Sequence, residues 1–204
     1  MPRICNGCGL KLLGNERTIC SACYLRLPET DYHNFEGNPV ERIFYGRVEI
    51  RMAAAFVFFE KGTEVQRLLK HLKYHGAQEV GLALGRRYGT QLAHSRFTAV
   101  DAVTCVPLHR KKLRKRGYNQ CHAFGKALSN AMNKPWYSKG IKRKTHTKTQ
   151  TAKGREQRWK TMQQAFTRGK ETKALEQKHV LLLDDVVTTG ATLEACASVL
   201  LKEG

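Results

Sequence analysis

The residues with the most specific chemistry lie near the end of the chain, where two acids follow an apolar run. The acids are Asp184 and Asp185, directly after residues 180–183. A turn with three hydroxyls comes next, formed by Thr188, Thr189, Gly190 and Thr192. Such a turn points N–H groups and a helix dipole at one spot, as a phosphate site requires, while neighbouring carboxylates can hold ribose hydroxyls or share Mg²⁺ with them. The pattern favours a ribose-phosphate site over the alternative that these residues only cap a helix.

A second chemical group stands at the start of the chain, where four cysteines are spaced C-x2-C-x11-C-x2-C. They are Cys5, Cys8, Cys20 and Cys23. Two such pairs can place four thiolates about 2.3 Å from one tetrahedral zinc ion, which closes its coordination shell. The alternatives are a disulfide pair in a secreted protein and an iron–sulfur cluster, but the start of the chain lacks a secretory apolar region. We therefore expect a structural zinc site.

Positive charge is concentrated in one part of the chain. Residues 101–173 hold 20 Lys+Arg against 3 Asp+Glu, whereas the remainder holds 16 against 14. A basic focus of this size indicates an anionic partner, although a solvated basic surface is the simpler alternative. Cations interleaved with aromatic rings are typical of single-stranded nucleic-acid grooves. The candidates for such contacts are Lys142, Arg143, Lys144, Lys148 and Trp159.

The apolar pattern predicts the elements that position these groups. Strands are expected at 52–59, 99–106 and 180–183, and helices after Gly62, over 78–93, after Gln120 and after the threonine turn. A strand, a basic loop at 107–118 and a helix in this order would place cations at the carboxyl edge of a mostly parallel sheet. The expected class is α/β, with a zinc module at 1–30, a linker at 31–47 and the main domain at 48–204. No apolar run reaches the roughly 20 residues of a membrane span, so we expect a cytoplasmic protein without membrane insertion.

The acid pair and threonine turn resemble the signature for phosphoribosyl pyrophosphate (PRPP) in type I phosphoribosyltransferases. Together with the four cysteines, the chain resembles the competence-associated ComF family over essentially its full length. Further matching motifs are 106–108, 116–120 and Lys73-Tyr74-x-Gly76. The resemblance implies a type I phosphoribosyltransferase-like fold. Because that family continues into a further strand, we expect a carboxy-terminal strand to be missing after Gly204.

The resemblance also implies roles for individual residues. Asp184 and Asp185 would hold the ribose hydroxyls, partly through Mg²⁺, and the threonine turn would hold the 5-phosphate. Residues of the basic loop would face the pyrophosphate, and they are Arg114, Arg116, Gly117 and Tyr118. Gln150 and Arg158 would belong to a mobile loop that closes over the site.

Three functions remain open at the level of sequence. A transferase would displace pyrophosphate from PRPP, a glycosyl (pentosyl) transfer that asks little covalent work of the protein. The family's link to DNA uptake implies instead direct binding of single-stranded DNA, or contacts with other DNA-uptake proteins. A regulator that senses PRPP without turnover is the third.

Overall fold

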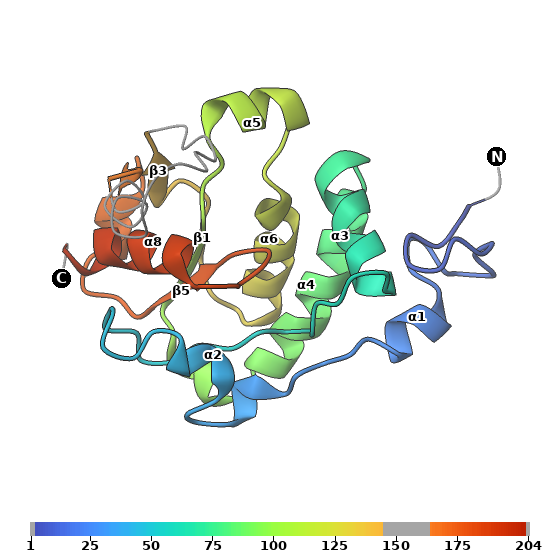
Figure 1. The fold of residues 1–204 in the computed structure, drawn as a ribbon, viewed down its shortest axis with the longest axis horizontal. Helices are drawn as coiled ribbons and strands as arrows, with labels where there is room; N and C mark the ends of the chain where they lie inside the picture. The colour runs from blue at the N-terminus through green and yellow to red at the C-terminus, as the bar shows by residue number, and fades with distance from the viewer. Residues whose placement is uncertain (1–2, 145–163, 203–204) are drawn as a thin grey trace.

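The computed structural model describes residues 3–144 and 164–202 of the chain (Figure 1). The α-helices are α1 (Ser21–Leu25), α2 (Pro39–Arg42), α3 (Glu64–Tyr74), α4 (Gln78–Leu92), α5 (Arg110–Arg116), α6 (Gln120–Ala131) and α8 (Ala191–Leu201). The strands are β1 (Ala102–Cys105), β2 (Trp136–Tyr137), β3 (Ile141–Arg143), β4 (Phe166–Arg168) and β5 (Val180–Leu183). Short 3-10 turns lie at Tyr32–Asn34, Arg96–Ala99 and Thr172–Leu175.

A parallel sheet of three strands forms the centre of the molecule, in the order β2-β1-β5. Its register pairs Val103 with Trp136 on one side and with Leu181 on the other. Strand β1 is buried along its whole length, as its continuous apolar run predicts for a central strand covered on both faces. The expected α/β class with a parallel sheet is therefore confirmed.

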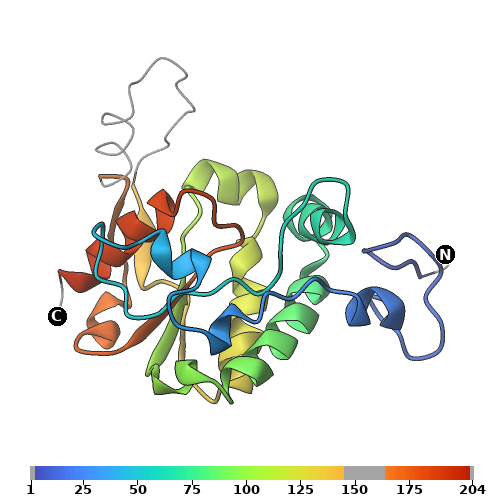
Figure 2. The same ribbon diagram turned by 60° about the horizontal axis from the view of Figure 1, so that its bottom comes forward.

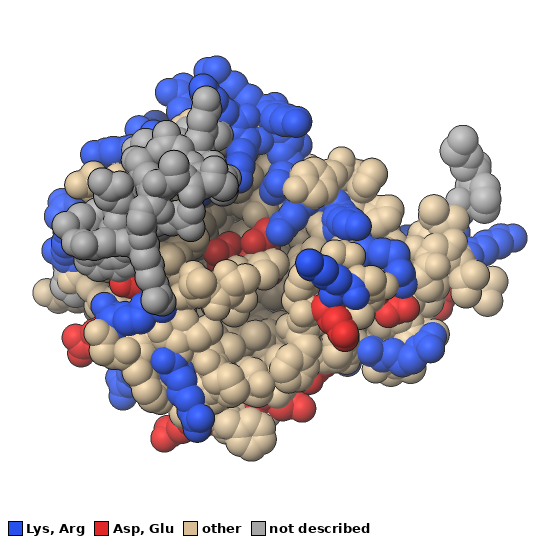
Figure 3. Space-filling model, viewed as in Figure 1, with Lys and Arg blue, Asp and Glu red and all other residues tan. Residues whose placement is uncertain are grey.

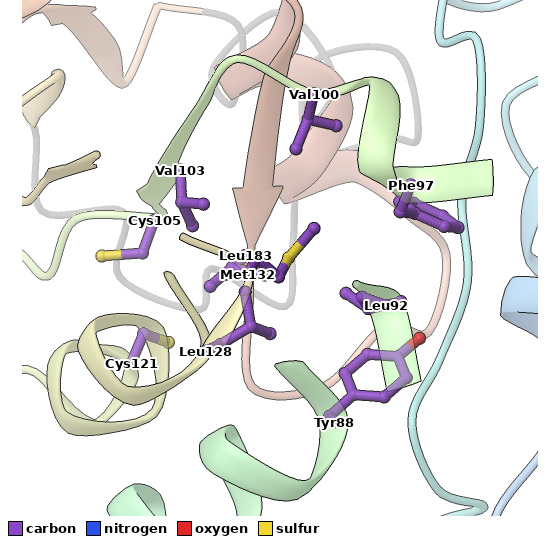
Figure 4. Close-up of a cluster of buried hydrophobic side chains, with 10 residues drawn as sticks. All are labelled: Tyr88, Leu92, Phe97, Val100, Val103, Cys105, Cys121, Leu128, Met132 and Leu183. Atoms are coloured by element: carbon purple, nitrogen blue, oxygen red, sulfur yellow. The ribbon is translucent and has the colours of Figure 1, made fainter. Parts of the chain in front are cut away.

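Helices cover one face of the sheet, and α8 with the β3–β4 hairpin covers the other. On the first face, Val103 and Cys105 of β1 pack with Leu128 of α6 and Leu92 of α4 in the cluster drawn in Figure 4. On the second face, Val106 packs with residues of α8, β3 and β4. The sheet therefore lies between two apolar layers, and its carboxyl edge stays open at the end where β1 and β5 terminate.

Glycines let α4 and α6 touch backbone to backbone. A Cβ atom at Gly85 would lie 2.2 Å from the carbonyl oxygen of Phe124, and one at Gly89 would lie 2.6 Å from that of Leu128. No side chain fits at these distances, so both positions need glycine. This backbone contact sets the distance between α4 and α6.

Two sequence predictions about elements are wrong. Among the described residues, 52–59 join no sheet and form one isolated bridge, between Val57 and Glu29. The stretch expected as a basic loop contains the helix α5, which is capped by His109 at its start and by Gly117, with φ +82°, at its end. Lys and Arg are good helix formers, so charge alone did not argue for a loop.

The four-cysteine module packs on the main domain instead of standing apart from it. Its Cys5, Leu12 and Ile19 share an apolar cluster with Leu68 of α3 and Leu84 of α4. In both views the module lies beside α3, on the side of the molecule away from α8 (Figures 1 and 2). Residues 31–47 are folded as well, since they contain α2.

Candidate functional site

The acid pair lies at the carboxyl edge of the sheet, as its position after β5 predicts. The backbone N–H of Asp185 donates to Oδ1 of Asp184 at 2.8 Å. Burial, and then the neighbouring Asp185, raise the pKa of Asp184 from 3.8 to about 7. Carboxylate oxygens are the ligands that Mg²⁺ prefers, and the pair combines two carboxylates at one point of the sheet edge.

Asp185 is held by side chains from two helices. Its Oδ2 lies 2.6 Å from Nζ of Lys73, at the end of α3, and accepts a hydrogen bond of 2.8 Å from Nε2 of Gln120, at the start of α6. Arg116, the last residue of α5, donates from Nη1 to Oε1 of Gln120. A chain of polar contacts thus runs from α5 through α6 to the acid pair.

The threonine turn forms the expected loop between β5 and α8. Together with Asp184, residues 186–193 line a small cavity of ≈40 Å³. Gly190 is the N-cap of α8 and adopts a left-handed conformation with φ +71°. The backbone N–H of Glu194 donates to the Gly190 carbonyl oxygen at 2.9 Å, which closes the first helical turn behind this cavity. The positive end of the α8 dipole therefore faces the cavity.

The segment after α2 braces this loop from outside. Nη1 of Arg47 donates to the carbonyl oxygen of Thr189 at 2.7 Å, and Arg47 also forms an ion pair with the buried carboxylate of Glu194. Side chains of Ile43 and Phe44 fill the space beside Gly190. Sequence reasoning missed these residues, because Arg47 and Glu194 are 147 positions apart and belong to no shared motif.

The predicted pyrophosphate residues separate into two groups. Arg116 is linked to the acid pair by Gln120, which contacts both Arg116 and Asp185. The Arg116 guanidinium lies 5.2 Å from the centre of the Tyr74 ring. Tyr118 donates its hydroxyl to the carbonyl oxygen of Leu72, which ties the turn after α5 to the end of α3. Arg114, in contrast, is an exposed residue on α5. The structure therefore brings Arg116 toward the acid pair and leaves Arg114 on the outer surface.

A large hollow of ≈1330 Å³ borders the acid pair and is lined mostly by apolar side chains. Its lining combines residues 50–59, β5 and part of α8 with Asp184 and Asp185. Figure 3 shows acidic side chains deep in the hollowed face, while Lys and Arg gather on the rim over α5. The hollow therefore combines apolar walls, an acidic patch and a basic rim.

The candidate nucleic-acid residues are only partly described. Lys142 and Lys144 are exposed, but Arg143 is half-buried and its guanidinium lies 5.2 Å from the centre of the Phe166 ring. Burial lowers the pKa of Arg143. Lys148, Trp159, Gln150 and Arg158 lie outside the described residues.

The four cysteines converge as a metal cluster. Their sulfur atoms all lie within 4.8 Å of one another, and those of Cys8 and Cys20 are 3.8 Å apart. A tetrahedral ion with bonds near 2.3 Å separates its sulfur ligands by about 3.8 Å, so the set fits zinc. Burial raises the pKa of Cys5, but backbone N–H groups, first that of Cys20, outweigh it and lower the pKa to about 7. The cluster can therefore bind a metal such as zinc.

Comparison with known proteins gives relatives along nearly the whole chain, although no protein-family model matches it. The chain is 26% identical over 98% of its length to the DNA utilization protein YhgH of Escherichia coli K12, covering 85% of that protein. It is 33% identical over 51% of its length to Competence protein F of Haemophilus influenzae, covering 45% of that protein. These relatives confirm the resemblance to the ComF family.

Among solved structures, the chain is similar to the glutamine PRPP amidotransferase from B. subtilis complexed with ADP and GMP. The identity is 17% and the TM-score 0.44, over 66% of this chain and 28% of that protein.

None of the helices within 3–144 and 164–202 has the length and apolar character needed to cross a membrane.

Proposed function

We propose that this relative of YhgH and Competence protein F binds PRPP together with Mg²⁺ at the carboxyl edge of its sheet. One observation carries the proposal: Asp184, the first residue of the acid pair, lines a small loop cavity at the positive end of a helix dipole. An anion-binding loop and paired carboxylates are the two halves of a ribose-phosphate site.

Each part of the site has a role in this proposal. Thr188, Thr189, Gly190 and Thr192 form the loop that receives the 5-phosphate. The carboxylates of Asp184 and Asp185 accept hydrogen bonds from the ribose hydroxyls and hold Mg²⁺, which supplies positive charge to the departing pyrophosphate when bound. Arg116 extends the same positive field from the rim, with Arg114 further out on α5.

Turnover would be a phosphoribosyl transfer. The bond between C1 of the ribose and pyrophosphate breaks, a nucleophilic atom of the acceptor forms the new bond to C1, and the sugar acquires cationic oxocarbenium character in the transition state. The basic rim stabilises the charge on the leaving group, and closure by the segment with Gln150 and Arg158 would exclude water. Release of pyrophosphate with an acceptor present separates an enzyme from a PRPP-sensing regulator of the same fold.

Calorimetric titration of PRPP with Mg²⁺ tests the site. We expect binding to the wild type and loss of Mg²⁺-dependent binding in Asp185→Asn. Glu176→Gln is the matched control. It removes an exposed carboxylate that precedes the start of β5, at the end of the strand away from the acid pair. Unchanged affinity in Asp185→Asn, with the control also unchanged, would refute the assignment of the acid pair.

A second candidate function is binding of single-stranded DNA, and the surface of α5 favours it. Six of its seven residues are Lys or Arg and none is buried. Lys142 and Lys144 add exposed cations on and after β3. The relatives are named for DNA utilization and competence, and exposed cations of this kind are what a sugar-phosphate backbone would contact.

Salt dependence of binding tests this second function. The triple variant Lys111→Gln, Lys112→Gln, Lys115→Gln should lower the slope of log K against log salt by about 0.7 for each DNA phosphate that the variant no longer neutralises. Lys61→Gln with Lys70→Gln is the control, since these lysines lie elsewhere on the chain, outside α5. A slope that the triple variant leaves unchanged would remove α5 from the DNA interface.

For the cysteine cluster we propose zinc as the resident metal. Its role is structural, because four thiolates leave no open position for a water or substrate. The module supplies buried apolar residues to the cluster shared with α3 and α4, so metal binding would stabilise that contact as well.

A further inference from the structure

The ion pair on Asp185 joins two parts of the chain that no motif connects. Lys73 Nζ lies 2.6 Å from Asp185 Oδ2, and the two side chains are 22% and 15% exposed. The same oxygen accepts the hydrogen bond from Gln120 at 2.8 Å. This geometry is that of a charge-assisted hydrogen bond, in a setting more shielded than a surface ion pair.

The position of Lys73 is fixed at its backbone, while its side chain keeps several rotatable bonds. Helix α3 is anchored by the buried side chains of Val65, Leu68 and Leu72. The Leu72 carbonyl oxygen accepts the hydroxyl of Tyr118, which holds the end of α3 against the turn before α6. The flexible four-carbon stem of a lysine can move its ammonium group by several ångströms without repacking such a helix.

The charge at this point explains why a cation is needed there. Asp184 and Asp185 are consecutive residues at a half-buried strand end, where two carboxylates repel each other more strongly than in open water. A divalent cation would offset that repulsion in the loaded protein. Among the described residues, the ammonium of Lys73 is in contact with Asp185.

We propose that Lys73 is a built-in counter-ion, which occupies the cation position on Asp185 in the ligand-free protein and moves to the bound pyrophosphate when Mg²⁺ and PRPP enter. The proposal rests on the proposed PRPP function and adds a positioning residue to it. Lys73 competes with the divalent cation for one oxygen, so it keeps the site closed to the metal alone. Once PRPP is present, the positive charge of Lys73 favours binding of Mg²⁺ together with PRPP, because the ammonium contacts the pyrophosphate.

The test measures two affinities whose changes have opposite sign. In Lys73→Met, the affinity for Mn²⁺ alone, followed by the paramagnetic resonance signal of the free ion, should rise several-fold. The affinity for PRPP at saturating Mg²⁺ should fall about tenfold or more, as expected when a hydrogen bond to a charged group is removed. Lys70→Met is the matched control, because it removes a lysine from the same helix and should change neither value.

A structural ion pair predicts a different result. If the contact only held α3 in place, Lys73→Met would weaken both affinities in parallel and lower the melting temperature. Lys73→Gln serves as a second variant that keeps a polar donor should the methionine variant fold poorly. Equal Mn²⁺ affinity in the wild type and both variants, including no measurable binding in any, would overturn the counter-ion role. Absence of PRPP binding to the wild type would instead refute the proposed function, and the Mn²⁺ comparison would still decide the counter-ion role.

Discussion

Replacing Gly190 by alanine is the sharpest test of how the phosphate loop is built. Gly190 has φ +71°, and an added Cβ would lie 2.6 Å from Cγ2 of Ile43 and 2.8 Å from Cε1 of Phe44. Both neighbours belong to the segment after α2, and Phe44 is only 3% exposed. Alanine therefore meets a backbone penalty and a steric penalty together.

The two penalties can be estimated separately. A non-glycine residue in the left-handed region costs about 1–2 kcal/mol, and overpacking a filled site costs about 1–3 kcal/mol. A combined loss of about 3 kcal/mol would lower the melting temperature of a chain of this size by roughly 6–12 °C. The loop should also lose phosphate affinity, because it must shift away from Phe44 to relieve the contact.

Gly46→Ala provides the matched control for thermal unfolding. Gly46 has φ +69°, almost the same backbone conformation, but an added Cβ would meet no atom within 4 Å. It should therefore show only the backbone penalty, about 1–2 kcal/mol. If Gly190→Ala has a melting temperature no lower than that of Gly46→Ala, then Ile43 and Phe44 do not restrict the phosphate loop, and the steric explanation is refuted.

Three further predictions concern the acid pair, the metal and the helix contact. Because burial raises the pKa of Asp184 to about 7 from 3.8, its proton stabilises the fold fully below about pH 4, and that stability is lost as the pH rises through 7. Asp184→Asn should remove this slope in Mg²⁺-free thermal melts, and equal slopes in both proteins between about pH 5 and 8 would contradict the assignment. The purified chain should carry one zinc ion, which Cys8→Ser should reduce; elemental analysis that finds iron, or no metal in the wild type, would rule this out. Gly85→Ala should lose about 1–3 kcal/mol of stability, because its Cβ would meet the Phe124 carbonyl, whereas an unchanged denaturation midpoint would show that α4 and α6 separate freely.

Local patterns determined the parts of this protein that depend on neighbouring residues in the chain. The run 180–183 forms β5 with the predicted bounds, because an apolar run between polar turns favours a buried strand. The turn after Asp185 forms the loop into α8, since glycine adopts φ +71° there at low cost. The four cysteine sulfurs converge as the spacing predicts, since each C-x2-C pair can present two sulfurs to one ion.

The pattern failed where a local preference was compatible with two structures. Residues 52–59 are apolar and suited to a strand, but no neighbouring strand within the described residues pairs with them apart from the single bridge at Val57. The basic stretch before Gly117 has the composition of a loop ligand and also of a helix, and the caps at its two ends settle the matter in favour of α5.

Only the tertiary structure decided which distant side chains reach the acid pair. Lys73 and Gln120 meet Asp185 because α3 and α6 pack beside the sheet with their ends at its carboxyl edge. Arg47 meets Glu194 because the segment after α2 crosses the start of α8. No periodicity or spacing encodes these contacts, since each depends on the relative placement of whole elements, which is fixed by packing of the entire core.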